Sequence, residues 1–174
     1  LDHPNILKLY EIYHDSSTKE VCIVTEFIKG QTLFTEINKR LTINEREAAK
    51  MIKQILQAIN YCHMQGITHN DIKAENIMLT NEDAAHPNVK LIDFGVARSS
   101  PQANPSIFGT ILYMAPEMMV SEHNEKCDLW SIGVIAYFLL SGDMAFFGDT
   151  AEELTACVIK GEYDYDSEIW EDIS

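Results

Sequence analysis

The sequence predicts an α+β fold that is mainly helical and begins with two strands. Two runs rich in β-branched and aromatic residues, 6–13 and 21–28, flank a polar stretch and indicate an antiparallel hairpin. Apolar residues then recur at helical spacing over residues 48–62, which indicates a long helix with one buried face. The nearly continuous apolar run at 129–140 predicts another long helix, buried on all sides.

The long central helix has sequence signals at both of its ends. Thr42-Ile43-Asn44-Glu45 has the pattern of a capping box, with a hydroxyl residue followed three positions later by a carboxylate. Gly66 predicts a left-handed end to the helix. Residues 32–40 predict a shorter helix before it, so this part of the chain is expected to form a helical pair.

Shorter elements follow the central helix. Residues 77–80 and 89–93 predict two short strands around a polar loop, and residues 150–160 predict a surface helix with acidic residues in its first turn. Prolines and a glycine interrupt the stretch between 101 and 116, which indicates a long irregular segment. Such segments inside compact domains usually have a function.

Composition limits the classes of partner. The chain has 174 residues and a formal net charge of −14, with 46% hydrophobic and 23% charged residues. Nucleic acid and anionic lipid are poor partners for this charge, whereas a basic peptide is favoured; solubility is the alternative explanation of the acidity. The longest apolar run, 132–140, is too short to cross a bilayer. We therefore expect no nucleic-acid and no membrane partner.

The cysteines indicate a reducing compartment. Cys22, Cys62, Cys127 and Cys157 form no CxxC or Cys/His metal spacing, so reduced, mostly buried thiols in a cytoplasmic protein are expected. The chain opens at Leu1 without an initiator methionine and has no signal-peptide pattern, which predicts a piece of a longer protein.

Three short motifs occur in order along the chain: His-Asn-Asp-Ile-Lys-Ala-Glu-Asn at 69–76, Asp-Phe-Gly at 93–95 and Ala-Pro-Glu at 115–117. Gly109-Thr110 and Asp-Leu-Trp-Ser-Ile-Gly at 128–133 add further matches. Each motif alone is weak, but their order and spacing resemble the protein kinase family over the whole chain.

The resemblance implies a protein-kinase-like fold. Residues 1–28 would be the end of the N-terminal lobe, with two strands and the hinge, and residues 29–174 would be the C-terminal lobe. Within that lobe we expect a catalytic loop at 69–76, an activation segment at 93–117 and a buried helix at 128–140.

The expected catalytic residues suit phosphoryl transfer from ATP. Asp71 can accept the proton of an incoming hydroxyl, and Lys73 can neutralise the moving phosphoryl group. Asn76 and Asp93 offer hard oxygen ligands for Mg²⁺. By the resemblance, Thr110 bonds the base and the lysine. Lys73 and Thr110 together are typical of Ser/Thr kinases, so a protein substrate with a Ser or Thr acceptor is expected.

The resemblance also implies a nucleotide site and a set of packed supporting residues. Thr25 would stand behind the adenine pocket, the backbone of Glu26 and Ile28 would bond the adenine edge, and Leu33 and Met78 would pack under its ring. Leu9, His69 and Phe94 are expected to belong to the family's hydrophobic spine, with Asp128 anchoring its base. Glu117 is expected to pair with an arginine beyond residue 174.

Within the family, the segments 24–27, 133–137 and 170–174 resemble the calcium/calmodulin-dependent and calcium-dependent group. This implies calcium- or calmodulin-type regulation from outside the sequence given. The family's Gly-rich loop, phosphate-pairing lysine and helix glutamate belong upstream of His3, so a partial domain that transfers phosphate negligibly by itself is expected.

Several positions depart from the family pattern. Asn70 stands where an arginine usually holds a phosphorylated activation loop, which leads to the hypothesis that activity does not depend on phosphorylation of Ser99, Ser100 or Ser106. Thr32 replaces a common glutamate, which weakens the expected preference for basic substrates, although Glu75 remains. The loop at 142–146 lacks prolines, for which we have no functional explanation.

Alternatives from other classes remain open. A pseudokinase that only binds partners is the main one, because Asn70 and Thr32 depart from the pattern. A small-molecule kinase is a further one, although such relatives lack a segment like 109–117. From Asp143 onward the chain has ten Asp or Glu and only Lys160 as a base, which is either a solvated face or a docking surface for basic segments.

Overall fold

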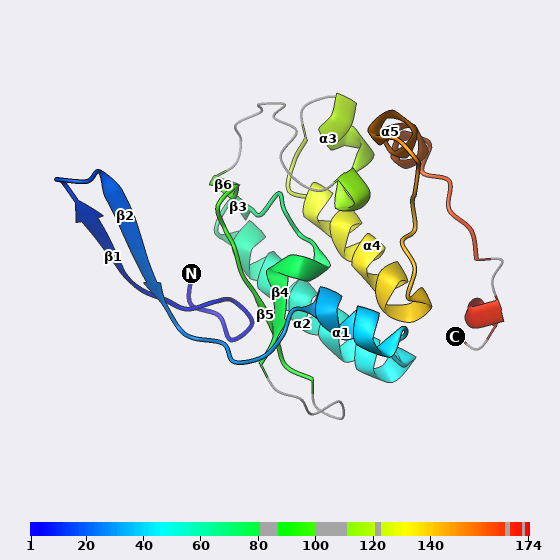
Figure 1. The fold of residues 1–174 in the computed structure, drawn as a ribbon, viewed down its shortest axis with the longest axis horizontal. Helices are drawn as coiled ribbons and strands as arrows, with labels where there is room; N and C mark the ends of the chain where they lie inside the picture. The colour runs from blue at the N-terminus through cyan, green and yellow to red at the C-terminus, as the bar shows by residue number, and fades with distance from the viewer. Residues whose placement is uncertain (81–86, 100–110, 121–122, 166–167, 172) are drawn as a thin grey trace.

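The computed structural model describes residues 1–80, 87–99, 111–120, 123–165, 168–171 and 173–174. A β-hairpin precedes a mainly helical body (Figure 1), so the predicted α+β class is confirmed. Short 3-10 turns lie at Ala74–Asn76, Ile111–Tyr113 and Glu168–Trp170. The other elements are β1 (Leu9–Asp15), β2 (Glu20–Thr25), α1 (Leu33–Arg40), α2 (Glu45–Met64), β3 (Ile67–Thr68), β4 (Ile77–Leu79), β5 (Val89–Leu91), β6 (Arg98–Ser99), α3 (Pro116–Val120), α4 (Cys127–Ser141) and α5 (Ala151–Lys160).

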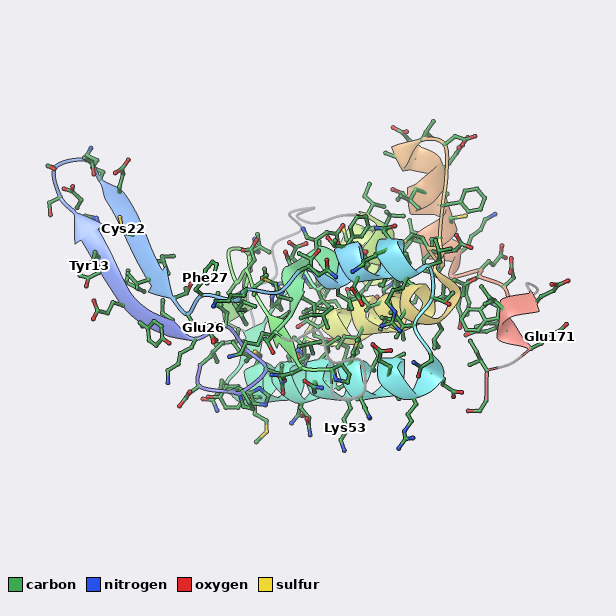
Figure 2. All side chains as sticks on the ribbon, turned by 60° about the horizontal axis from the view of Figure 1, so that its bottom comes forward. Tyr13, Cys22, Glu26, Phe27, Lys53 and Glu171 are labelled. Carbon is green, nitrogen blue, oxygen red and sulfur yellow. The ribbon has the colours of Figure 1, made fainter. Side chains whose placement is uncertain are left out.

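The β1–β2 hairpin confirms the predicted antiparallel pair, with bounds shifted by a few residues. Tyr13 lies opposite Cys22 in its register. The hairpin projects from the body, and its side chains extend from both faces (Figures 1 and 2). It is joined to the body where the amide of Leu7 donates to the carbonyl of Leu91 at 2.9 Å. The segment before the hairpin is therefore hydrogen-bonded to β5, the strand that leads into the Asp-Phe-Gly motif.

Helices α2 and α4 pack side by side and form the centre of the core. The predicted apolar face of α2, from Ala48 to Cys62, is buried in most places, but Leu56 is 40% exposed and Ile52 only partly buried. Helix α4 ends at Ser141 and is capped by Gly142, whose φ of 78° is left-handed. A Cβ at Gly142 would lie 2.1 Å from the carbonyl oxygen of Leu41, so the backbones after α1 and α4 touch there. Only glycine permits both the conformation and this approach.

The predicted capping box at 42–45 is wrong by two residues. The cap of α2 is Asn44, whose side-chain oxygen accepts from the amide of Glu47 at 3.1 Å. The amide of Ile43 donates to the carbonyl of Leu139 at 2.9 Å, and its side chain is buried. This tertiary contact holds the chain before the helix against α4, and the helix begins only after it.

Two predictions about burial are wrong in part. Helix α4 was expected to be buried on all sides, but Leu129 is 47% exposed and Gly133 is exposed. The thiols were expected to be mostly buried; Cys62 and Cys127 are, whereas Cys22 on the hairpin is exposed. Within the part of the chain that the structure describes, no helix is long and apolar enough to cross a membrane.

Two further strand pairs place the motif-bearing loops. Strand β3 pairs with β6, which brings the start of the 69–76 loop to the segment after Asp-Phe-Gly. Strand β4 pairs with β5, which joins the end of the same loop to the strand before Asp93. The loop at 69–76 is therefore fixed at both ends to the chain around residues 89–99.

Candidate active site

The expected catalytic residues of the 69–76 loop form one hydrogen-bonded cluster. Lys73 Nζ donates to Asp71 Oδ2 at 2.8 Å. Asn76 Nδ2 donates to the same Asp71 Oδ2 and to the Asp71 backbone carbonyl, both at 2.9 Å. The 3-10 turn Ala74–Asn76 allows this contact, because it folds Asn76 back towards Asp71. The structure therefore brings together three of the side chains that the sequence assigns to the catalytic site.

Asp93 lies in an exposed, left-handed turn with a φ of 59°. Its Oδ1 accepts from the amide of Gly95 at 3.0 Å, and the amide of its neighbour Ile92 donates to the carbonyl of Asn76 at 2.9 Å. The backbone ladder thus sets the two expected metal ligands next to each other.

The donor set at Asn76 and Asp93 fits Mg²⁺. Both hydrogen bonds of Asn76 Nδ2 go to oxygens of Asp71, so the amide orientation is fixed and Oδ1 is the acceptor that remains for a cation. Among the described residues, no group of three or more His, Cys, Asp or Glu could hold a metal ion. A site with few carboxylates is the kind that Mg²⁺ occupies together with substrate phosphates and water.

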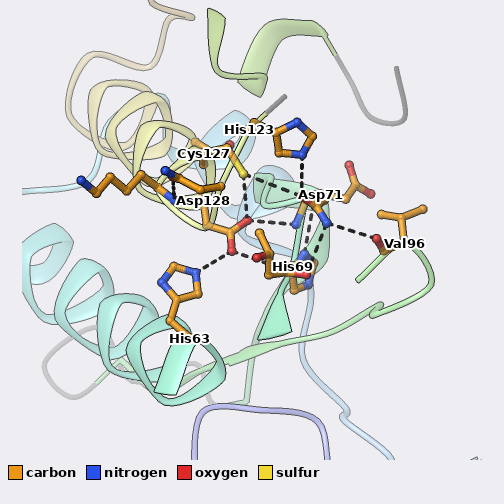
Figure 3. A network of polar contacts seen from close by, with 12 residues as sticks. His63, His69, Asp71, Val96, His123, Cys127 and Asp128 are labelled. Atoms are coloured by element: carbon orange, nitrogen blue, oxygen red, sulfur yellow. Dashed lines mark hydrogen bonds and ion pairs between the residues drawn. The ribbon is translucent and has the colours of Figure 1, made fainter. Parts of the chain in front are cut away.

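The buried carboxylate of Asp128 organises the backbone before Asp71 (Figure 3). Its Oδ1 accepts from the amide of Asn70 and its Oδ2 from the amide of His69, both at 2.9 Å. His63 Nε2 lies 2.8 Å from the same Oδ2. Asp128 is 1% exposed, so water does not compete with these contacts. Hydrogen bonds to a charged group are strong in such surroundings. Sequence reasoning expected Asp128 as an anchor but missed His63.

His69 is a packed residue. It is fully buried, and its ring centroid lies 4.7 Å from that of Phe94. Burial lowers the pKa of His69, and the nearby Asp128 opposes the shift. The ring is therefore neutral at physiological pH and suits the expected structural role. Leu9, the third expected spine residue, is 47% exposed.

The expected hinge residues surround a polar contact that sequence reasoning missed. Glu26 Oε1 accepts from Lys90 Nζ at 2.5 Å and from the amide of Lys8 at 2.7 Å. Burial opposes ionisation of Glu26, but these donors outweigh it and its pKa is lowered. Thr25 Oγ1 donates to the Glu26 carbonyl at 3.1 Å. Glu26 therefore connects the expected hinge to β5, the strand before Asp93.

The remaining adenine-site residues differ in exposure. Ile28 and Met78 are partly exposed, so each has surface to offer a ring. Leu33 is fully buried in the core, and its burial supports packing rather than ligand contact. A cavity of about 580 Å³ lies between the hairpin and the Asp93–Ser99 segment, with Thr25 and Asp93 in its lining. Glu26, Ile28 and Met78 do not line this cavity.

Thr110 lies outside the described residues, so its contacts with Asp71 and Lys73 stay a prediction. Nearby, Ser131 Oγ donates to the carbonyl of Tyr113 at 2.7 Å, which holds the chain before Ala-Pro-Glu against α4. Glu117 is only partly buried. The buried Oε2 of Glu75 has no hydrogen-bond partner among the described residues.

Comparison with known proteins decides the family. The model of the protein kinase domain family matches residues 1–174. The chain belongs to the protein kinase family. This kinase chain is 40% identical over 176 residues to Calcium-dependent protein kinase 5 of Plasmodium berghei, an alignment that covers 100% of the chain and 31% of the relative.

Other kinases give the same result. Calcium-dependent protein kinase 5 of Plasmodium falciparum is 40% identical over 176 residues, covering 100% of the chain and 30% of the relative. Death-associated protein kinase 2 of Mus musculus is 40% identical over 175 residues, covering 99% of the chain and 47% of the relative. These relatives confirm the resemblance to the Ser/Thr kinases of the calcium- and calmodulin-dependent group. This kinase chain spans less than half the length of each of the three.

Proposed function

We propose that the protein transfers the γ-phosphoryl group of ATP to serine or threonine hydroxyls of proteins. The observation that supports this best is the Asp71 cluster. Within the described residues, Lys73 and Asn76 both bond Oδ2 of Asp71. That arrangement leaves Oδ1 to receive a hydroxyl, and the ammonium group of Lys73 beside it would meet the negative charge that develops on the moving phosphoryl group.

Each residue has a task in this reaction. Asp71 orients the acceptor hydroxyl and takes its proton as the new phosphate ester bond forms, while the bond from the γ-phosphorus to the β–γ bridging oxygen breaks and ADP leaves. Lys73 stabilises the charge on the moving group, since phosphoryl transfer depends on positioning and electrostatics. Asn76 and Asp93 would hold Mg²⁺, which when bound neutralises the phosphates. Thr110 would fix Asp71 and Lys73.

The proposed substrate is a protein segment with a Ser or Thr acceptor and basic residues near it. Lys73 and Thr110 support the acceptor class, and the net charge of −14 supports the basic flank. The names of two relatives are the basis for proposing calcium-linked regulation. The four free thiols support a cytoplasmic location, which stays a proposal.

The test is a transfer assay on the product of the complete reading frame that encodes this sequence. It uses γ-labelled ATP, Mg²⁺ and basic peptides with Ser, Thr or Tyr as the acceptor. Asp71→Asn should lower kcat by about 10²- to 10⁴-fold, because the base is lost. The matched control, Asp149→Asn, changes an exposed carboxylate in the loop before α5 and should leave kcat unchanged.

Two results would contradict the proposal. Nucleotide binding without any phosphoryl transfer by the wild-type protein would favour the pseudokinase alternative. The reason to consider that alternative is Asn70, which departs from the family pattern. Transfer to choline or an aminoglycoside in preference to a peptide would favour the small-molecule alternative.

A further inference from the structure

Asn70, the residue before Asp71, joins three separate segments through its side chain. Two of the residues it contacts, Val96 and His123, are labelled in Figure 3. Its Nδ2 lies 3.4 Å from the carbonyl of Thr68 in β3 and 3.4 Å from the carbonyl of Val96 after Asp-Phe-Gly. Its Oδ1 lies 3.1 Å from Nε2 of His123, in the segment before α4. One amide therefore connects the catalytic loop, the start of the activation segment and the chain that leads into α4.

The hydrogen-bond chemistry fixes the orientation of this amide. Two carbonyl oxygens face one end of Asn70, and a carbonyl can only accept, so that end must be the NH₂ group. The other end must then be the oxygen, and the groups facing it must donate. Cys127 Sγ lies 3.7 Å from Oδ1, and burial raises the pKa of this thiol to about 12, so it carries its proton. His123 must likewise carry a proton on Nε2.

Asparagine is suited to this position in its backbone as well. Asn70 has a φ of 64°, in the left-handed region that asparagine tolerates better than most residues. An arginine here would offer no acceptor to His123, and an aspartate would offer no donor to the carbonyls of Thr68 and Val96.

We propose that His123 is a positioning residue for phosphoryl transfer: through Asn70 it holds the catalytic loop against the activation segment without a phosphate group. The inference rests on the proposed kinase function. Asp71 follows Asn70 directly, so a shift of the Asn70 side chain moves the carboxylate that receives the hydroxyl. Small misplacements of reacting groups are costly, with about 1 Å enough for a 10²-fold loss.

The test separates the hydrogen bond of His123 from its bulk, on the product of the complete reading frame. His123→Phe keeps a ring of similar size and removes the donor, whereas His123→Gln removes the ring and keeps an N–H donor. We expect the Phe variant to lose about tenfold in kcat with KM for ATP and peptide within twofold, and the Gln variant to retain most of its kcat. His14→Ala, an exposed histidine on β1, is the control and should match wild type.

A double-mutant cycle tests whether the effect passes through residue 70. Asn70→Gly removes the side chain and tolerates the left-handed φ without strain. In that background, His123→Phe should cause no further loss in kcat, because the link is already broken. Additive losses would overturn the inference, and so would a Phe variant as active as wild type.

Hydrogen exchange on the same proteins separates the two proposals. Faster exchange of amides in the 69–76 loop of the Phe variant, and not of the Gln variant, is the expected result. If the wild-type protein transfers no phosphate, the proposed function fails. Unchanged amide exchange in the 69–76 loop of the Phe variant would then overturn the role of His123 as well. Faster exchange would support the role of His123 in positioning this loop even without phosphoryl transfer.

Discussion

Asp128→Asn should be among the most destabilising single-atom changes in this chain. The carboxylate accepts from the amides of His69 and Asn70 and from His63, and it is 1% exposed. An asparagine can keep its oxygen towards the two donors that share Oδ2, but its NH₂ group then faces the amide of Asn70. That amide is left without a partner, which costs about 1–3 kcal/mol, and the two remaining bonds fall from charged to neutral strength at about 1 kcal/mol each.

The expected total is about 3–5 kcal/mol of unfolding free energy, or roughly 6–20 °C in Tm for a chain of this size. Urea unfolding followed by circular dichroism measures it, and an unchanged m-value would show that the same transition is observed. Asp149→Asn, on an exposed carboxylate, is the control and should change stability by less than about 0.5 kcal/mol. A loss below about 1 kcal/mol for Asp128→Asn would refute the reasoning, since it would mean that the three contacts add little.

Three further predictions follow from burial and charge. Burial lowers the pKa of His69, so below about pH 6.5 the unfolded chain binds a proton that the folded chain does not. The free energy of unfolding should therefore fall as the pH drops, by at most about 1.4 kcal/mol per pH unit. Urea midpoints at pH 7.5 and 5.5 check this, and His69→Phe should make the free energy of unfolding less dependent on pH. Burial raises the pKa of Cys127 to about 12, so iodoacetamide at pH 8 should label exposed Cys22 well before Cys127, and equal rates would contradict this. Arg40→Ala should lower the free energy of unfolding in urea by about 2 kcal/mol, because Arg40 Nη1 and Nη2 donate to the buried Glu47 at 2.7 and 2.8 Å. An unchanged free energy of unfolding would show that water replaces the guanidinium.

The sequence was sufficient where a pattern is local or is tied to one chemistry. Helical periodicity predicted α2, and the motif at 69–76 identified Asp71, Lys73 and Asn76, whose side chains the structure brings together; their catalytic roles stay a prediction. Both patterns are local, so the spacing along the chain already sets the geometry, as when a 3-10 turn returns Asn76 to Asp71.

What the sequence did not predict depends on contacts between distant segments. The start of α2 differs from the predicted one because the amide of Ile43 donates to the carbonyl of Leu139, far along the chain. The ion pair of Glu26 with Lys90 and the contact of Asn70 with His123 join residues that have no fixed spacing. Of these residues, only Asn70 departs from the family pattern, and the fold is needed to identify His123 as its partner.

The hairpin β1–β2 has a consequence for the behaviour of the chain in solution. Its exposed large apolar side chains are Leu9, Tyr10, Ile12, Tyr13, Val21, Ile23 and Val24. Within the part of the chain that the structure describes, the hairpin forms a two-stranded sheet, so the outer edge of each strand presents backbone groups to a neighbouring copy. Apolar faces together with open edges favour strand addition between molecules, so the apparent molar mass of this 174-residue chain, measured by light scattering, should rise with concentration. Charged substitutions such as Ile12→Lys and Ile23→Lys, which lie opposite each other in the register, should suppress it.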